Sequence, residues 1–395
     1  MRLALFTDTY GPDVNGVART LGRWTDYLKR RGIECMVFAP DSAARDSAPG
    51  GSATVERFVS LPFFLYPECR LALPNPIHIR RALHAFKPTL VHVATPFNLG
   101  LCGIHYARKY ELPLVASYHT HFDRYLPFYN LQWMVKMLWR YMDWFHQDCR
   151  SIFVPSKSTY QDLIQRGWDA RRLAVWSRGI DPQVFHPQVD RSKLLAEHGI
   201  EENPFIVLYV GRLAPEKNVD VALEAYASFQ RNICPDSILV LAGDGPSADT
   251  LKERCAKEGI PARFLGFTGT EALQQWYAAA DVFLFPSPTE TFGNVVLEAM
   301  ACGTPVLCAD SGGVTDSVTH GVTGLRCVPG SASSFADGLE LLYRNEDLRG
   351  QLSVRGRAHS ARQSWDAIFD DLLARCHEAS LGQSHPIRPI SGDNF

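Results

Sequence analysis

The chain has 395 residues, and its 40 basic and 42 acidic side chains give a formal net charge of −2 at pH 7. This length predicts two domains with sizeable cores, and the balanced charge argues against a nucleic-acid-binding protein that relies on bulk charge. No apolar run reaches the roughly 18 residues of a membrane span, and the N-terminus lacks a secretory leader, so we expect a cytoplasmic protein.

The 10 cysteines occur singly, without a C-x-x-C pair, and several lie in apolar segments, for example Cys35, Cys102 and Cys308. This pattern predicts buried free thiols rather than disulfides or zinc ligands. The chain also contains no Asp-x-Asp sequence, the usual carboxylate pair for a catalytic Mg²⁺ or Mn²⁺ ion. We therefore expect no metal and no cofactor.

Continuous apolar runs alternate with helix-like stretches, which predicts α/β domains with parallel sheets covered on both faces. The predicted strands are 2–8, 35–39, 90–94, 114–118 and 151–155, then 205–210, 238–242, 263–266, 282–285 and 306–309. The pattern restarts after a polar stretch that contains proline. We place an N-terminal domain at 1–185, a second Rossmann-like domain at 186–362, a last helix at 363–380 and a disordered tail at 381–395.

The stretch from Glu290 to Glu298 spans a predicted loop and a short helix over 293–301. Free backbone N–H groups at the start of a helix attract anions, whereas carboxylates accept hydrogen bonds from hydroxyl groups. This arrangement suits a sugar on one side of a diphosphate and a ribose on the other. The expected N–H donors are Phe292, Gly293 and Asn294.

Arg212 and Lys217 follow the predicted strand 205–210, at a carboxyl end where ligands bind in such sheets. Two cations there could hold a diphosphate and neutralise the charge that develops as a nucleoside diphosphate leaves. A solvated surface loop is the alternative, and Glu290 and Glu298 downstream argue against it.

Gly16 lies in the turn between the first strand and a helix, where glycine lets the backbone approach a ligand closely or serves the turn sterically. His119 follows the predicted strand 114–118 and could hydrogen-bond a donor sugar or an acceptor, although a lone histidine is more often structural.

The two-glutamate stretch and the Gly-Arg-Leu-x-x-Glu-Lys segment at 211–217 resemble retaining glycosyltransferases of family 4, which include sucrose and glycogen synthases. The resemblance extends from Met1 to about Asp370. It implies the GT-B fold, two Rossmann-like domains facing across a cleft, and transfer of a hexose from a UDP- or GDP-sugar with retention of configuration. It also implies front-face attack, with the leaving phosphate as base.

The resemblance gives each candidate residue a role. Arg212 and Lys217 would bind the diphosphate, Glu298 the ribose and Glu290 the sugar hydroxyls. His119 would sit near the reacting carbon. The matching Gly16 would contact the donor phosphates, and backbone groups near Phe267 would read the base.

The segment Trp176-x-Arg178-Gly-Ile-Asp, with segments 13–20 and 65–74, most resembles sulfoquinovosyl-diacylglycerol synthases and GDP-mannose-dependent lipid mannosyltransferases. These relatives imply a lipid or lipid-linked glycan as acceptor. Arg178 stands where many relatives have Asn. It would add a third cation at the diphosphate or form an interdomain ion pair.

The predicted helix over 131–147 is apolar except for one narrow polar stripe. Such a surface is buried in protein or inserted into a bilayer interface, which would make the protein peripheral on the inner face of the membrane. Basic residues of the first helix would either attract anionic headgroups or form a solvated face: Arg19, Arg23, Lys29, Arg30 and Arg31.

Two other functions compete. Gly243-Asp-Gly-Pro-Ser-Ala248 fits G-x-G-x-x-A of dinucleotide oxidoreductases, but no acidic residue follows at the end of the next strand, and no P-loop sequence occurs. A sugar-nucleotide-binding protein of the same fold without transferase activity is the second alternative. The intact set of two cations and two glutamates argues against it.

Overall fold

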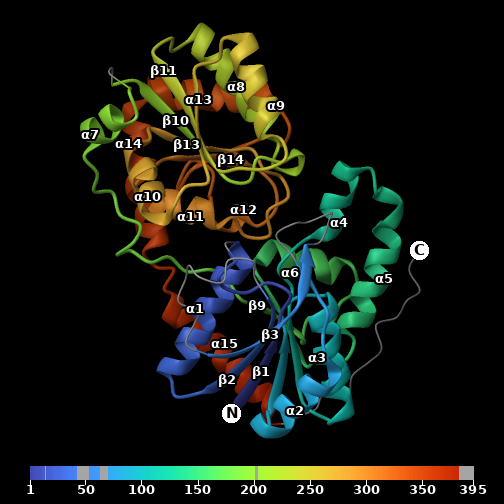
Figure 1. Ribbon diagram of the computed structural model, residues 1–395. Helices are drawn as coiled ribbons and strands as arrows, with labels where there is room; N and C mark the ends of the chain where they lie inside the picture. Colours follow the sequence, from blue (N-terminus) through green and yellow to red (C-terminus); the bar gives the residue numbers. More distant parts are fainter. Residues whose placement is uncertain (14, 42–52, 63–69, 201–202, 382–395) are drawn as a thin grey trace. The chain divides into compact units, whose positions relative to one another are not determined.

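The computed structural model describes residues 1–13, 15–41, 53–62, 70–200 and 203–381 (Figure 1). Contacts divide the chain into two compact units. The first contains residues 1–123, 131–177 and those from 366 onward, and the second contains residues 124–130 and 178–365. Each unit is built around its own mainly parallel sheet, which confirms the predicted α/β fold.

The first unit has a seven-stranded parallel sheet in the order β3-β2-β1-β6-β7-β8-β9. Its central strands are buried and apolar because helices cover a parallel sheet on both faces. The strands are β1 (Arg2–Phe6), β2 (Glu34–Pro40), β3 (Thr54–Phe58), β6 (Leu90–Val93), β7 (Leu114–Ser117), β8 (Ser151–Val154) and β9 (Leu173–Val175), and a small antiparallel pair adds β4 (Ser60–Pro62) and β5 (Arg70–Ala72).

The second unit has a six-stranded parallel sheet in the order β12-β11-β10-β13-β14-β15. The strand order reverses between β10 and β13, and ligands bind at such switch points in open α/β sheets. The strands are β10 (Phe205–Val210), β11 (Ser237–Ala242), β12 (Ala262–Gly266), β13 (Val282–Phe285), β14 (Val306–Ala309) and β15 (Leu325–Cys327).

Helices connect the strands in each unit. The first unit has α1 (Gly16–Arg30), α2 (Pro76–Phe86), α3 (Asn98–Lys109), α5 (Val135–His146) and α6 (Lys157–Gln165), and α15 (Trp365–Ser380) joins it from the C-terminal part of the chain. The second has α7 (Arg191–Glu197), α8 (Val219–Asn232), α9 (Ala248–Glu258), α10 (Thr270–Ala279), α11 (Asn294–Ala301), α12 (Val314–Ser317), α13 (Ala332–Arg344) and α14 (Glu346–Ser360). Short turns are α4 (Phe122–Tyr125), η1 (Leu126–Tyr129), η2 (Gln132–Met134) and η3 (Pro215–Lys217).

Every strand predicted from the apolar runs is present, with ends shifted by at most a few residues. Five strands were not predicted: β3, β4, β5, β9 and β15. Four of them, β4, β5, β9 and β15, have only three residues each, which is too short to give a clear periodicity, and β3 is largely half-buried at the edge of its sheet. The predicted tail, residues 65–69 and Val14 lie outside the described residues, apart from Leu381.

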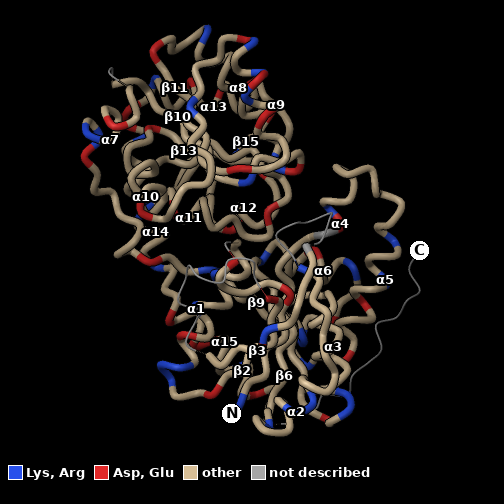
Figure 2. Tube along the Cα trace, in the orientation of Figure 1, with Lys and Arg blue, Asp and Glu red and all other residues tan. Residues whose placement is uncertain are grey.

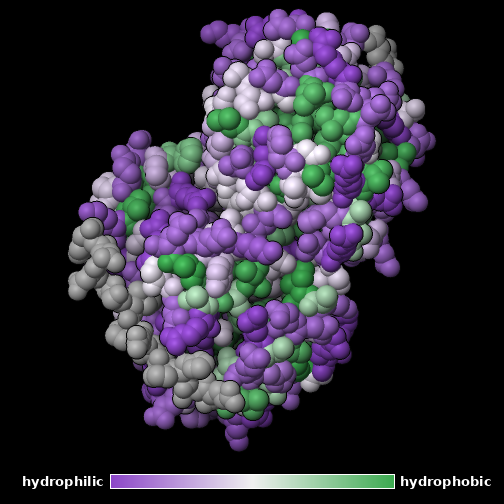
Figure 3. Space-filling view, turned by 180° about the vertical axis from the view of Figure 1, so that it is seen from behind, coloured by the Kyte–Doolittle hydropathy of each residue, from purple (hydrophilic) through white to green (hydrophobic). Residues whose placement is uncertain are grey.

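The cysteines and the surface agree with the expectations from composition. All cysteines among the described residues are free thiols, and all but Cys102 are buried, as predicted. On the face shown in Figure 3, hydrophobic residues surface as separate patches among hydrophilic ones. Within the described part of the chain, no helix combines the length and the apolar character that crossing a membrane requires.

Helix α15 packs against α1 through an aromatic cluster. The ring of Phe369 lies 5.3 Å from the rings of both Trp24 and Tyr27, and Trp24 and Phe369 are buried. Ion pairs flank this cluster, with Arg30 Nη2 2.6 Å from Asp366 Oδ1. Aromatic burial of this kind contributes several kcal/mol, so α15 is a structural part of the first unit.

Asp8, which follows β1, is a buried carboxylate that ties this strand to the start of α3. Thr95 Oγ1 donates to Oδ2 at 2.7 Å, and the N–H of Leu99 donates to Oδ1 at 3.0 Å. Burial raises the pKa of Asp8 to about 6, although these hydrogen bonds by themselves would lower it. The folded chain therefore holds a proton on Asp8 more readily than the unfolded chain does.

Asp8→Asn should change the pH dependence of stability. Because the pKa in the folded state is about 6 and the ordinary value is 3.8, the Asp8 contribution to stability should fall as the pH rises from about 4 to about 6. The difference in unfolding free energy between wild type and variant should change by about 2–3 kcal/mol over this range. Denaturant unfolding across the range measures it, with Glu378→Gln, an exposed change on α15, as control. A difference independent of pH would contradict this account.

Candidate functional site

The loops that carry most of the predicted site meet at one edge of the second sheet. All strands of this sheet run parallel, so their carboxyl ends lie at the same edge. Residues 211–217 follow β10, Gly243 follows β11 and Phe267 follows β12. The segment 286–293 follows β13, and residues 310–313 follow β14.

Two predicted site residues form a close ion pair at this edge. Lys217 Nζ lies 2.5 Å from Glu290 Oε1, and Ser287 Oγ donates to the same carboxylate oxygen at 3.0 Å. The side chains of Lys217 and Glu290 retain only 13% and 16% of their solvent exposure. The structure therefore brings together an amine from the loop after β10 and an acid from the loop after β13.

The second predicted cation, Arg212, is held by a carboxylate that the sequence analysis had not assigned a role. Arg212 forms an ion pair with Glu216, whose side chain is completely buried. The hydroxyl of Tyr129 donates to Glu216 Oε2 at 3.1 Å. Glu216 thus orients Arg212 in the loop that also carries Lys217.

Lys217 remains protonated despite its burial. Loss of water around the amine lowers its pKa, but the Glu290 carboxylate and the hydroxyl groups of Tyr125 and Tyr209 together raise it by more, and the resulting pKa lies above the ordinary lysine value. Lys217 Nζ also lies over the ring of Tyr125, 5.9 Å from its centroid. Tyr125 and Tyr129 belong to the segment 124–130, which groups with the second unit.

Helix α11 begins four residues after Glu290, and its first turn has no side-chain cap. Gly293 precedes the helix with φ +84°. A Cβ atom on Gly313 would lie 2.1 Å from the carbonyl oxygen of Thr291, so only glycine fits there. Asn294 Oδ1 is buried and accepts no hydrogen bond from the described residues. This helix start offers N–H donors and an unused acceptor beside a carboxylate.

Glu298 lies on α11, partly buried, and its position is fixed by a tyrosine. The hydroxyl of Tyr277 donates to Glu298 Oε2 at 3.0 Å, and Tyr277 itself is fully buried in α10. Glu298 remains a hydrogen-bond acceptor in this arrangement, which is the property that the sequence analysis required of it.

The glycines of the G-x-G-x-x-A segment have a packing role. A Cβ atom on Gly243 would lie 2.0 Å from the carbonyl oxygen of Gly211, and one on Gly245 would lie 2.4 Å from that of Leu213. The loop after β11 therefore packs backbone to backbone on the loop that carries Arg212. This close approach explains both glycines without a dinucleotide.

Phe267 is an exposed aromatic residue directly beyond β12. Phe267 is 68% exposed, and it follows Gly266, whose carbonyl oxygen accepts a hydrogen bond from the N–H of Gly243. A planar ring at this edge is available to stack on a planar ligand group.

The first unit carries His119, His121 and Gly16. His119 is buried at the end of β7, with its ring 5.5 Å from that of Trp176. The ring of His121 lies within hydrogen-bond distance of Tyr118 and Thr159, which indicates a structural role for it. The choice of His119 over His121 as the functional candidate stays a prediction.

Gly16 and Arg178 occupy different environments. Gly16 is the exposed first residue of α1, whose N-terminus is capped by Asn15 through the N–H of Ala18 at 2.9 Å. Arg178 belongs to the second unit and is buried, and this burial lowers its pKa to about 9. It therefore still carries a positive charge at neutral pH.

Three residues of the site were not predicted from the sequence: Glu216, Tyr125 and Tyr129. Glu216 lies four residues after Arg212, a spacing at which opposite charges often pair, so its role could have been noticed. Tyr125 and Tyr129 come from a segment far from the motif, and nothing in the sequence links them to it. Within the described residues, no group of three His, Cys, Asp or Glu side chains is arranged to hold a metal ion.

Two family models match the chain. The model for glycosyl transferases group 1 matches residues 190–359, and the model for glycosyltransferase family 4 matches residues 14–184. Sulfoquinovosyl transferase SQD2 from Arabidopsis thaliana is 30% identical over 96% of this chain and 74% of its own length. A GDP-mannose-dependent alpha-mannosyltransferase from Mycobacterium tuberculosis is 31% identical over 97% of this chain and 98% of its own.

Solved structures share the fold. Sucrose-phosphate synthase from Thermosynechococcus elongatus superposes with a TM-score of 0.80 at 20% identity, over 96% of this chain and 98% of that one. Anabaena HepE in complex with UDP gives a TM-score of 0.76 at 22% identity, over 96% and 100%. These likenesses confirm the predicted GT-B fold, and with the sequence matches they establish that the chain is a glycosyltransferase and belongs to glycosyltransferase family 4.

Proposed function

We propose that the protein is a retaining glycosyltransferase that moves a hexose from a UDP- or GDP-sugar to an acceptor hydroxyl. The observation that carries this proposal is the pair of cation–carboxylate contacts at one sheet edge, Lys217 with Glu290 and Arg212 with Glu216. The relatives named above are transferases by their names, and this chain's own residues suit the same class of reaction.

The diphosphate of the donor would bind Arg212 and Lys217. Both cations are already oriented by carboxylates, so the diphosphate oxygens can replace those carboxylates without a search for new side-chain positions. Lys217 stays protonated at neutral pH. As the sugar–phosphate bond breaks, both cations would stabilise the charge on the departing phosphate, so we propose that no metal ion or cofactor is required.

The donor sugar would lie at the start of α11. The backbone N–H groups of Phe292, Gly293 and Asn294 and the positive end of the helix dipole favour a partially negative ligand there. Asn294 Oδ1 lacks a hydrogen-bond donor among the described residues. A sugar hydroxyl would satisfy it, while Glu290 accepts from another.

The ribose and the base would lie further along the same edge. Glu298 accepts a hydrogen bond from Tyr277 and has capacity for the ribose hydroxyls. Backbone groups near the exposed Phe267 would contact the base. From the first unit, we propose that His119 lies near the reacting carbon and Gly16 near the phosphates, on the family resemblance. Arg178 is proposed as a third cation.

We propose that the acceptor is a lipid or a lipid-linked glycan. We also propose that the enzyme is cytoplasmic and works at the inner face of the membrane. A relative named for a lipid product is an alpha-monoglucosyldiacylglycerol synthase from Streptococcus pneumoniae, 30% identical over 78% of this chain and 70% of its own length. Such an acceptor requires contact with a membrane surface and needs no nucleic acid.

A donor panel tests the proposal directly. Nucleotide release from UDP-glucose, UDP-sulfoquinovose, UDP-glucuronate and GDP-mannose would be measured with lipid extract as acceptor, and we expect turnover of at least one. Binding of a nucleotide sugar without turnover of any would favour a binding protein of the same fold instead. The anomeric configuration of the product, read by NMR, tests retention.

Lys217→Ala should lower kcat by about 10²–10³, the usual loss when one stabiliser of a developing anion is removed. The measurement is the steady-state rate with saturating donor. Lys257→Ala removes an exposed lysine of the same unit and serves as the control. A rate close to that of wild type in Lys217→Ala would exclude the assigned role.

Glu298→Ala should chiefly raise the KM for the donor, by about 10-fold for one lost charged hydrogen bond, and change kcat less. Glu253→Ala, an exposed change on α9, is the matched control. If donor affinity were unchanged in Glu298→Ala, the ribose would have to be bound elsewhere.

A further inference from the structure

One surface of the first unit is strongly basic. From Arg70 to Tyr110 the sequence contains no Asp or Glu, although the whole chain has 42 acidic residues and a net charge of −2. Exposed cations of this stretch lie on α2 and α3: Arg80, Arg81, Arg108 and Lys109. Figure 2 shows Lys and Arg along these two helices. A surface of this charge favours an anionic partner.

The neighbouring helix α5 presents large apolar side chains to solvent. Trp133, in the turn before α5, is 72% exposed, and Met137 and Trp144 are 55% and 43% exposed. Lys136 and Arg140 are exposed on the same helix. Their spacing of three or four residues gives α5 one face that combines aromatic, apolar and basic groups, the composition of helices that lie in a bilayer interface.

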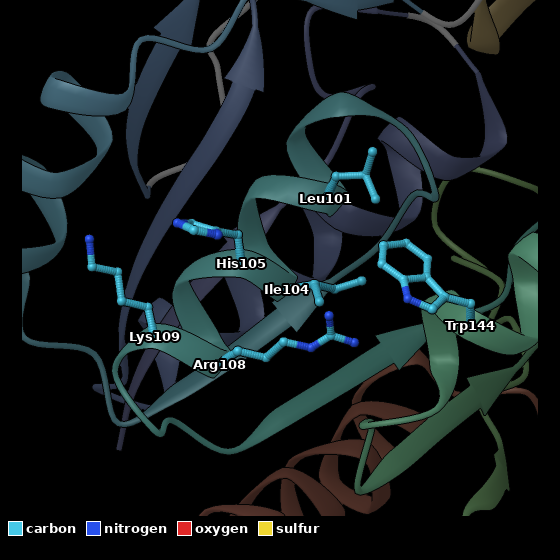
Figure 4. A pocket seen from close by; sticks show the side chains of 6 residues that line it. All are labelled: Leu101, Ile104, His105, Arg108, Lys109 and Trp144. Carbon is cyan, nitrogen blue, oxygen red and sulfur yellow. The ribbon is translucent and has the colours of Figure 1, made fainter. Parts of the chain in front are cut away.

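A groove of 560 Å³ runs between α3 and α5. Leu101 and Ile104 form part of its wall, and Figure 4 shows Arg108 reaching toward the indole of Trp144. The guanidinium carbon lies 5.4 Å from the indole centroid, and Arg108 Nη2 is 2.5 Å from Asp148 Oδ2. The groove therefore combines the Arg108 cation, which is paired with Asp148, with an apolar wall.

His105 and Lys109 also line this groove, and Figure 4 shows the ends of their side chains pointing away from Trp144. The basic groups thus continue from the groove across the outer surface of α3. A phospholipid whose phosphate binds at the groove would place its apolar part against Leu101 and Ile104. The groove therefore suits an amphiphile better than a free anion.

Two of the basic residues at the C-terminal end of α1 form ion pairs within the first unit. Arg30 pairs with Asp366 and Arg31 pairs with Asp370, both on α15 within the same unit. These pairs neutralise part of the basic run on α1. Helices α2 and α3, by contrast, contain no acidic residue of their own.

We propose that the exposed faces of α2, α3 and α5 form a docking surface for anionic phospholipid, with the α3–α5 groove binding a lipid phosphate. The inference rests on the proposed lipid acceptor. The cations attract the anionic headgroups, and Trp133, Met137 and Trp144 enter the interface. A bilayer accounts for both the charge and the exposed tryptophans, whereas an acidic protein would account only for the charge.

Vesicle co-sedimentation tests the surface, with phosphatidylcholine vesicles alone and with added phosphatidylglycerol. Wild type should bind the anionic vesicles more strongly, and raising NaCl from about 0.05 to about 0.5 M should weaken this binding. The double variant Arg80→Glu/Arg81→Glu should bind at least about 20-fold more weakly, because each cation near an anionic surface contributes roughly five-fold. Trp133→Ala should weaken binding several-fold.

The control is Arg355→Glu/Arg357→Glu, which reverses the same charge on exposed positions of α14 in the second unit and should bind like wild type. Equal binding to both vesicle types, no salt dependence, or equal losses in both double variants would overturn the proposal. So would failure of wild type to bind either vesicle.

Donor turnover without vesicles separates this inference from the proposed function. Arg80→Glu/Arg81→Glu should release nucleotide from a soluble donor at the wild-type rate, because the change leaves the second unit intact. Vesicle binding without any turnover would retain the surface and reject the transferase reaction. Turnover without vesicle binding would retain the transferase reaction and reject the docking surface.

Discussion

The contact between the loops after β10 and β13 is the constraint on which the rest of the site depends. The sheet order places β10 beside β13, so Lys217 and Glu290, 73 positions apart in sequence, can meet at 2.5 Å. Glycines let the supporting loops approach at backbone distance, with Gly243 against Gly211 and Gly313 against Thr291. A bulkier residue at either glycine would push apart the loops that hold the charges.

Burying charges costs free energy, and pairing them reduces that cost. Lys217 and Arg212 are kept in a poorly hydrated place because Glu290 and Glu216 compensate them. Such pairs contribute little net stability, so their value is positional: they keep two cations ready for an anion that replaces the carboxylates. The basic residues on α2 and α3 need no such pairing, because water solvates their charges. A large anionic surface is the partner that such a set of charges would attract.

Much of the fold could be predicted from the sequence because buried parallel strands appear as continuous apolar runs, and β10, β13 and β14 were predicted to the residue. The pairing of Lys217 with Glu290 could be expected only as proximity, since both follow strands of one sheet. The roles of Tyr125 and Tyr129 could not be predicted, because the segment that carries them precedes β8 in the chain and no sequence pattern links it to Lys217 and Glu216. The G-x-G-x-x-A segment shows the reverse case, a motif explained by packing alone.

A crystal structure of the protein with bound UDP or GDP would test the central claim most directly. The account predicts that the diphosphate oxygens lie about 3 Å from the guanidinium of Arg212 and from Lys217 Nζ, a hydrogen-bond distance, with Glu290 displaced from the lysine. A nucleotide bound elsewhere, with both cations still paired to Glu216 and Glu290, would contradict it.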